Sequence, residues 1–106
     1  MRQEIVESHK TDENGNPTGG ESLGTGININ WQNGPLGRGT ERIPPTGAFV
    51  EGVISAALGR LKHYQNSKFK CDANENAIWH LEQALCDLDG RTKEREDRQV
   101  EGTHMA

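Results

Sequence analysis

The sequence predicts an α+β fold, in which a small antiparallel β-sheet in the N-terminal half packs with a C-terminal antiparallel helical hairpin. Two observations predict it. The first half is rich in Gly, Asn and Thr and contains strand-like alternation, whereas the second half has apolar residues at helical spacing. We expect a single domain over residues 1–106, with a β-rich part over 1–45, the helical hairpin over 46–99 and a C-terminal tail over 100–106.

The first 20 residues contain one candidate strand and one turn-rich segment. Residues 3–9 are a candidate for a short strand. Residues 12–20 contain the pairs Asn14-Gly15, Asn16-Pro17 and Gly19-Gly20, which are typical of turns. We therefore expect this second segment to reverse the chain.

The clearest strand signal lies at residues 27–32, where apolar and polar residues alternate. Its core-facing residues would be Ile27, Ile29 and Trp31. Asn33-Gly34-Pro35 ends this strand, and residues 36–42 are a candidate for a returning strand. Pro44-Pro45 then stops regular pairing, because proline has no N–H to donate.

Two amphipathic helices are expected in the second half. The first spans residues 48–64, and the second begins near Asp72 and continues to about Arg98. Gly90 weakens the second helix by up to ~1 kcal/mol relative to Ala. The stripe of the first helix contains Val50, Val53, Ile54, Ala57, Leu58 and Leu61. The stripe of the second contains Ala77, Ile78, Leu81, Ala84, Leu85 and Leu88.

Composition and charge exclude several classes of protein. Only 31% of the residues are hydrophobic, so the core of one copy is thin and a symmetric homo-oligomer is expected. The chain has 12 Lys+Arg against 16 Asp+Glu, which argues against a nucleic-acid partner. No apolar stretch approaches the ~18 residues of a membrane span, and the first residues lack a signal-peptide core. We expect no membrane partner and action in the compartment where the chain is made.

The two cysteines do not form a disulfide framework. Cys71 and Cys86 are too few for such a framework in a cytosolic chain. A zinc site made with His80 is conceivable, but the spacing matches no common pattern. Cys86 is more simply interpreted as a small buried residue on a helix face, and we expect no metal and no cofactor.

The most informative feature follows Leu88. Arg91, Arg95 and Arg98 are spaced by four and three residues, so they share one helix face and extend the leucine stripe. A guanidinium at the edge of a core favours a carboxylate or a phosphate. The alternative is an ordinary charged helix end, in which Glu94 and Glu96 pair with the arginines.

Tyr64, at the end of the first helix, is a second candidate. By itself it is more simply explained as a residue that caps the core. An aromatic face near arginines and an amide such as Asn74 would, however, suit a purine nucleotide, because it combines stacking, edge hydrogen bonds and charge.

Catalytic motifs are poor. The sequence has no Gly-x-Ser-x-Gly, no His-Glu-x-x-His and no P-loop, since no Gly-Lys-Ser/Thr follows its glycine-rich pieces. The histidines have no evident nucleophile partner. We therefore name no catalytic residues and do not expect an enzyme.

Several motifs together resemble the phage Thoeris anti-defence sponge family, which lies beside the anti-CBASS sponges with their related helical hairpin. The likeness covers roughly residues 26–104, and its closing motif is long and specific. The motifs are Trp31-Gln32-Asn33-Gly34-Pro35, Arg60-Leu61-Lys62-His63-Tyr64-Gln65, Phe69-Lys70-Cys71-x-x-Asn74, His80-Leu81-Glu82-Gln83-Ala84-Leu85 and Arg91-Thr92-x-x-Arg95-Glu96-x-Arg98-x-Val100-Glu101-Gly102-Thr103-His104.

The resemblance implies a non-enzymatic function in the cytoplasm of the infected bacterial host. Members of this family bind cyclic ADP-ribose isomers such as glycocyclic ADP-ribose, made by TIR-domain enzymes, and hold them intact. Thoeris immunity is then not triggered. Members form dimers and, in several cases, hexamers built as trimers of dimers. Some also hold cyclic di- or trinucleotides of CBASS in a separate pocket.

The resemblance also assigns roles to residues. Tyr64 would stack on adenine, Asn74 would bond its polar edge, and Arg91 and Arg95 would grip the pyrophosphate. Arg98 continues the same arginine stripe, and Gly102 and Thr103 would close the site. Arg38 is the candidate for the second nucleotide pocket.

Three alternatives to a cyclic ADP-ribose sponge remain open. They are a sponge mainly for CBASS cyclic oligonucleotides, an enzyme that hydrolyses the signal, and a phage structural or assembly protein. The sequence departs from the family pattern in having Tyr64 where some members have Phe, Gly90 where a helix former is usual, and Pro44-Pro45 before the first helix.

Overall fold

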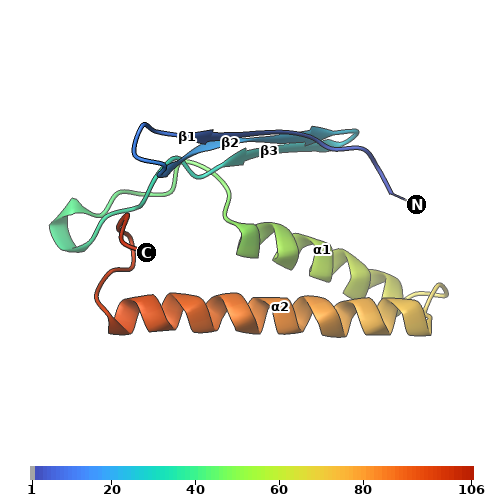
Figure 1. Ribbon diagram of the computed structural model, residues 1–106. Coiled ribbons are helices and arrows are strands. Elements are labelled where there is room, and N and C mark those ends of the chain that lie inside the picture. Colours follow the sequence, from blue (N-terminus) through green and yellow to red (C-terminus); the bar gives the residue numbers. More distant parts are fainter. Residues whose placement is uncertain (1) are drawn as a thin grey trace. The chain divides into compact units, whose positions relative to one another are not determined.

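The computed structural model describes residues 2–106, which form two compact units (Figure 1). The first unit contains the described residues up to Phe49 together with Gln99–Ala106, and the second contains Val50–Arg98. The first is a three-stranded antiparallel sheet with its loops, and the second is a helical hairpin. The predicted α+β class is confirmed.

The sheet has the order β1-β2-β3, with strands β1 (Val6–Thr11), β2 (Pro17–Gly24) and β3 (Ile27–Trp31). The first strand begins three residues later than expected. The expectation of a purely turn-forming segment over residues 12–20 is wrong for its second half, because β2 occupies Pro17–Gly24 and pairs with both neighbours. Strand β2 was not predicted because it contains glycines, which are uncommon in the middle of a strand.

The true turn between β1 and β2 is confined to residues 12–16. The Asp12 carboxylate accepts hydrogen bonds from the main-chain N–H groups of Asn14 (2.9 Å) and Asn16 (3.0 Å). These bonds, above all the one from Asn16, lower the pKa of the Asp12 carboxyl below its ordinary value. A short polar side chain therefore fixes the hairpin turn.

The alternation predicted for β3 is confirmed. Ile27, Ile29 and Trp31 are half-buried, while Asn28 and Asn30 between them are exposed. The Trp31 indole donates a hydrogen bond of 2.9 Å to the hydroxyl of Ser22, which is only 3% exposed. The Ser22 hydroxyl on β2 thus provides the hydrogen-bond acceptor for the indole N–H on the half-buried face.

The expected returning strand over residues 36–42 is wrong. This segment is a loop that contains a short 3-10 helix, η1 (Gly39–Glu41). Gly37 and Gly39 have φ values of 86° and 58°, in the left-handed region that a strand does not use. The chain then returns beside β3, where the Ala48 N–H donates to the Asn30 carbonyl (2.7 Å) and the Gln32 N–H donates to the Ala48 carbonyl (3.0 Å).

The hairpin consists of α1 (Val50–Gln65) and α2 (Asp72–Asp97), which pack on each other. Both helices occur where the sequence predicts them. Helix α1 starts two residues late because Ala48 is engaged in the extended bridge with Trp31. Helix α2 starts at Asp72 after an N-cap at Cys71, continues through Gly90 and ends before Gln99, whose φ of 61° is left-handed.

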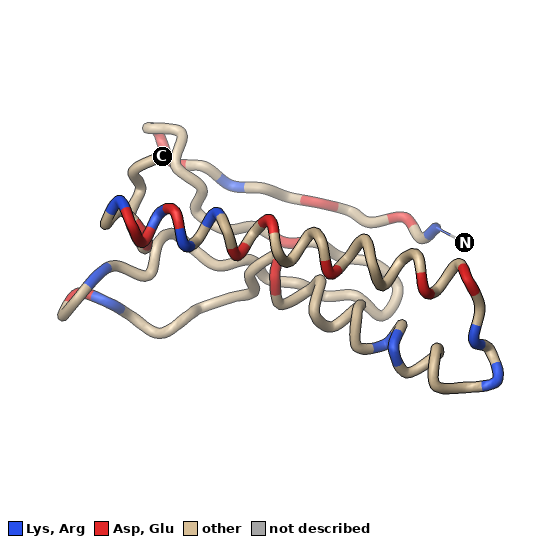
Figure 2. The backbone as a smooth tube through the Cα atoms, turned by 90° about the horizontal axis from the view of Figure 1, so that it is seen from below, with Lys and Arg blue, Asp and Glu red and all other residues tan. Residues whose placement is uncertain are grey.

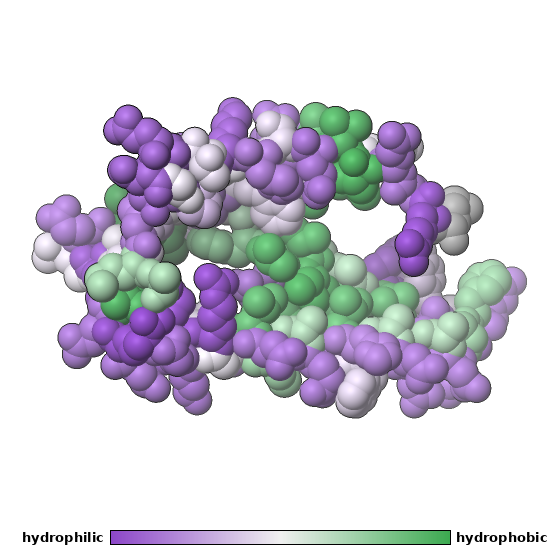
Figure 3. All heavy atoms as spheres, viewed as in Figure 1, coloured by the Kyte–Doolittle hydropathy of each residue, from purple (hydrophilic) through white to green (hydrophobic). Residues whose placement is uncertain are grey.

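The stripe predicted for α2 is confirmed, because all six of its apolar residues are half-buried while most of their neighbours are exposed. In α1, the residues Val53, Ile54, Leu58 and Leu61 are buried or half-buried, whereas Val50 and Ala57 are exposed. Apolar side chains are concentrated over the region of α1 in Figure 3.

The core is as thin as the composition predicts. Among the described residues, the buried hydrophobic side chains are Leu58 (7% exposed) and Val100 (8% exposed). Large apolar side chains remain open to solvent, Trp79 at 58% and Phe69 at 66% among them. Within the described part of the chain, no helix combines the length and apolar character needed to cross a membrane.

Candidate ligand-binding residues

The loop between α1 and α2 is held by a side-chain clamp. The Gln65 side chain donates to the carbonyl of Cys71 (2.9 Å) and accepts from the main-chain N–H of the same residue (3.2 Å). One amide thus ties the last residue of α1 to the residue that caps α2. The two helix ends at this loop are fixed relative to each other.

A second set of hydrogen bonds joins Tyr64 to Asn74, the two residues expected to hold an adenine. The Ser67 hydroxyl donates to the Tyr64 carbonyl and accepts from the Phe69 N–H (3.1 Å). The Asn74 amide then donates to the Phe69 carbonyl (3.4 Å). The structure therefore brings Tyr64 and Asn74 to the same end of the hairpin.

Both side chains at this loop end can still meet a ligand. Tyr64 is 38% exposed, and the guanidinium carbon of Arg60 lies 4.8 Å from its ring centroid. The Asn74 amide uses its N–H₂ group on the loop, which leaves its carbonyl oxygen as an acceptor. An aromatic ring and an amide acceptor at the same end of a hairpin can together stack on a purine and accept from its amino group.

The three arginines of the predicted stripe differ from one another. Arg95 is half-buried, whereas Arg91 and Arg98 are exposed, so the expected extension of the buried stripe holds for Arg95 alone. Arg98 forms an ion pair with Glu94, four residues earlier. For Arg98 the structure therefore matches the alternative of a charged helix end.

Arg95 lies on a part of α2 that extends beyond α1, whereas Arg91 lies level with the first turn of α1. Helix α1 has 16 residues and α2 has 26, which corresponds to lengths of about 24 Å and about 39 Å. Glu51, in the first turn of α1, lines a groove with Leu85, Cys86, Asp89 and Thr92 of α2. The residues of α2 that follow this groove are 93–97, and Arg95 is among them.

Charges of both signs alternate along this end of α2 (Figure 2). The backbone around Arg91 and Arg95 is one continuous helix, so their side chains emerge one turn apart. Two guanidinium groups at that spacing can bind the two phosphates of a pyrophosphate.

The loop end and the arginine end do not meet in one copy of the chain. Along α2, Asn74 is about 26 Å from Arg91 and about 31 Å from Arg95. Tyr64 lies at the Asn74 end. A single hairpin thus carries the two halves of the predicted site separately.

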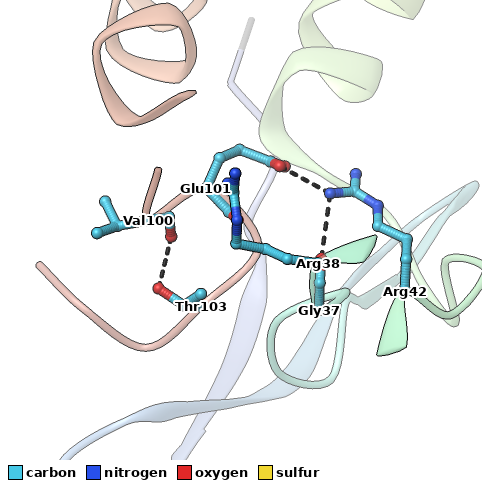
Figure 4. A network of polar contacts seen from close by, with 6 residues as sticks. All are labelled: Gly37, Arg38, Arg42, Val100, Glu101 and Thr103. Atoms are coloured by element: carbon cyan, nitrogen blue, oxygen red, sulfur yellow. Dashed lines mark hydrogen bonds and ion pairs between the residues drawn. The ribbon is translucent and has the colours of Figure 1, made fainter. Parts of the chain in front are cut away.

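The remaining predicted residues, Arg38, Gly102 and Thr103, belong to the sheet unit, where the tail joins the loop over residues 36–43 (Figure 4). The Gly37 N–H donates to the Gly102 carbonyl (2.8 Å), and the Arg38 guanidinium donates to the Glu101 carbonyl (3.0 Å). Gly102 has a φ of 78°, and its Cα approaches the Gly37 carbonyl so closely that a side chain there would collide with it.

An ion pair completes this tail network. The Arg42 guanidinium lies 2.7 Å from the Glu101 carboxylate and also donates to the Gly37 carbonyl (3.3 Å). The Thr103 hydroxyl donates to the Val100 carbonyl. A single network therefore contains residues assigned to different pockets: Arg38 was assigned to the second nucleotide pocket, and Gly102 and Thr103 to the cyclic ADP-ribose site.

The sequence analysis missed the residues that hold these sites. Ser67 and Arg42 belong to none of the motifs, and Gln65 ends one of them without an assigned role. Their partners are main-chain groups or residues far along the chain, which local patterns do not reveal. Arg60 had a usable signal, since a cation and an aromatic residue four apart on a helix share one face.

The conceivable zinc site is not formed within the chain. Cys71 and Cys86 are exposed free thiols, and 15 positions of helix separate them by about 22 Å. Over the described residues, no three His, Cys, Asp or Glu side chains gather closely enough to hold a metal ion. The expectation that Cys86 is a small buried residue is wrong, because it faces solvent on α2.

The chain was compared with models of protein families and with curated proteins. No model of a protein family matches the chain. Over 76 residues, 72% of its length, the chain is 46% identical to "Thoeris anti-defense 1" of Bacillus phage SBSphiJ7. The chain spans about half (51%) of the length of this relative. Over the matched segment, the chain therefore belongs to the Thoeris anti-defence family.

Proposed function

We propose that the protein is a phage anti-defence sponge, which binds glycocyclic ADP-ribose or a related cyclic ADP-ribose isomer in the cytoplasm of the infected host and withholds it from the Thoeris effector. The name of its relative motivates the anti-Thoeris role. One observation supports the ligand class: the hairpin has an aromatic ring and an amide acceptor at one end and two arginines one helical turn apart towards the other, which suit an adenine and a pyrophosphate.

In this proposal each ligand is bound between two copies of the chain. The two sets of residues are separated by about 26 to 31 Å along α2. The adenine and the pyrophosphate of one cyclic molecule lie far closer together than this. Tyr64 and Asn74 of one copy therefore combine with Arg91 and Arg95 of another. A two-fold axis produces two such sites at once, because each copy supplies both halves.

The rise per residue of α2 also determines where the two-fold axis of this dimer would cross the helix. If two α2 helices run antiparallel with Asn74 opposite Arg95 of the second copy, the axis passes between Ala84 and Leu85. If Asn74 is opposite Arg91, the axis passes near Glu82 and Gln83. The middle of α2 thus becomes the centre of the interface, and a thin core with exposed apolar residues fits a chain that completes its burial by association.

Sequestration requires affinity and slow release rather than groups that stabilise a transition state. Stacking on Tyr64, an edge hydrogen bond to Asn74 and two arginine contacts suit nanomolar binding, which corresponds to about −12 kcal/mol. The proposal therefore includes that the ligand leaves the protein chemically unchanged.

The test is a calorimetric titration of the full chain with glycocyclic ADP-ribose, followed by heat denaturation and chromatography of the released nucleotide. Tight binding with intact ligand recovered is the expected result. Recovery of only a linear product would show an enzyme instead. The absence of any binding heat would refute the ligand class, and an oligomer without nucleotide affinity would indicate a structural or assembly protein.

A second ligand class, the cyclic di- and trinucleotides of CBASS, is proposed for the region of Arg38. Its guanidinium donates to the main-chain carbonyl of Glu101, and no ion pair of the described residues includes it. A phosphate is a stronger partner for a guanidinium than a neutral carbonyl. If a cyclic trinucleotide binds without displacing cyclic ADP-ribose, the two pockets are separate; displacement would place both ligands in one site.

A further inference from the structure

The last turns of α1 place a cation on the ring of the chain's only tyrosine. Arg60 and Tyr64 are four residues apart, and the guanidinium carbon of Arg60 lies 4.8 Å from the ring centroid of Tyr64. Side chains at this spacing share one face of a helix. The distance is within the range of a favourable cation–π contact, in which a planar guanidinium also stacks on an aromatic ring.

This contact restricts the orientation of the Tyr64 ring. Tyr64 is 38% exposed, so the packing of the hairpin alone leaves part of the ring in solvent. A guanidinium over one face opposes rotation of the ring. The neighbouring His63 ring lies 6.0 Å away and is tilted by 55°, so it does not stack on the Tyr64 ring, which is compatible with a flat ligand on the opposite face. A base then binds to an ordered platform and pays less conformational entropy.

We propose that Arg60 is a positioning residue of the nucleotide site, which holds the Tyr64 ring in the orientation that stacks on a purine. This inference rests on the proposed function, because Tyr64 is the adenine platform there. Arg60 does not contact the ligand in this arrangement. It acts through the ring, as the outer layer of a guanidinium–phenol–purine stack.

The other cations near this end of the hairpin provide a matched comparison. Lys62 lies on the same helix, two positions from Arg60 and therefore on a different face, and both residues are exposed. Lys68 lies over the Phe69 ring instead, at 5.4 Å. Replacing Arg60 or Lys62 removes the same charge from the same helix end, but only Arg60 contacts the Tyr64 ring.

The test compares Arg60→Ala with Lys62→Ala in calorimetric titrations with glycocyclic ADP-ribose. Arg60→Ala is expected to weaken binding about threefold to tenfold, while Lys62→Ala changes it by less than about twofold. Arg60→Lys, which keeps a cation without the planar group, is expected to restore part of the loss. A purely electrostatic role for this helix end would make the two alanine variants equal.

A spectroscopic measurement without ligand checks the contact itself. The δ-methylene protons of Arg60 should show an upfield ring-current shift in the NMR spectrum, which disappears in Tyr64→Leu. Absence of that shift, or equal affinities of the two alanine variants in a chain that binds the ligand, would overturn the role of Arg60 and leave the proposed function standing. Failure of the unsubstituted chain to bind would overturn both.

Discussion

The two ends of the helical hairpin are built differently. At the loop end, side chains of Gln65, Ser67 and Asn74 are hydrogen-bonded to main-chain groups, so the candidate adenine platform is fixed within one copy of the chain. At the other end, α2 extends beyond α1, so Arg95 lies on a part of the helix that α1 does not accompany, and Arg91 lies level with the first turn of α1. In the proposed function, one half of the site is preorganised and the other half is completed by a second copy.

If the proposed function holds, this difference explains how a small chain can bind its ligand tightly. A chain of 106 residues has little room for an enclosed cavity, and its core is thin. A site assembled between two copies buries the ligand in surface that neither copy needs to enclose alone. Binding and association are then coupled, because a ligand held by both copies stabilises the dimer.

The largest effect should follow from removing the arginine end. We expect Arg95→Ala to weaken binding of cyclic ADP-ribose at least about a hundredfold, because a charge-assisted contact to the pyrophosphate is lost. Helix content measured by circular dichroism should not change. The matched control is Arg98→Ala, whose guanidinium pairs with Glu94 and whose loss should change affinity less than about threefold. Equal losses in both variants would contradict the assignment of Arg95.

A smaller effect is expected at the adenine platform. Tyr64→Ala removes the stacking ring and should weaken binding about tenfold to a hundredfold, as is typical for a base stacked on an aromatic side chain. Tyr64→Phe keeps the ring and should remain within about threefold of the unsubstituted chain. The calorimetric titration distinguishes the two. If Phe is as damaging as Ala, the hydroxyl rather than the ring carries the interaction.

The smallest effect tests the preorganised loop. Gln65→Ala removes two hydrogen bonds to Cys71 and should lower the free energy of unfolding by about 1 kcal/mol in urea denaturation. Lys62→Ala, at an exposed position of α1, is the control and should be close to neutral. If the two variants are equally stable, the clamp does not fix this end of the hairpin.

The helices were easier to predict from the sequence than the sheet. Their apolar spacing survives in the structure because the hairpin buries one continuous stripe, and α2 continues through Gly90 without interruption. Strand β2 was missed because Gly19, Gly20 and Gly24 carry no strand signal. The structure explains the glycine at position 20, because a side chain there would collide with the main chain of β1. The loop over residues 36–42 was misjudged because its glycines adopt left-handed backbone angles.

The candidate site was predictable residue by residue, but its geometry was not. Spacing placed Arg91, Arg95 and Arg98 on one helix face, yet only the lengths of α1 and α2 show that they lie far from Asn74. Pairs such as Arg42 with Glu101 join residues far apart along the chain, and local patterns do not contain that information.

The most direct test of the shared site is a mixing experiment with two variants that are each expected to bind more weakly. Arg95→Ala and Asn74→Ala are each titrated with glycocyclic ADP-ribose alone, and then after co-refolding in equal amounts. If each site takes Asn74 from one copy and Arg95 from another, a mixed dimer regains one intact site, and the mixture should bind with unsubstituted affinity at about a quarter of the sites. If both residues act within one copy, the mixture would bind no better than the separate variants, which would contradict a site shared between copies.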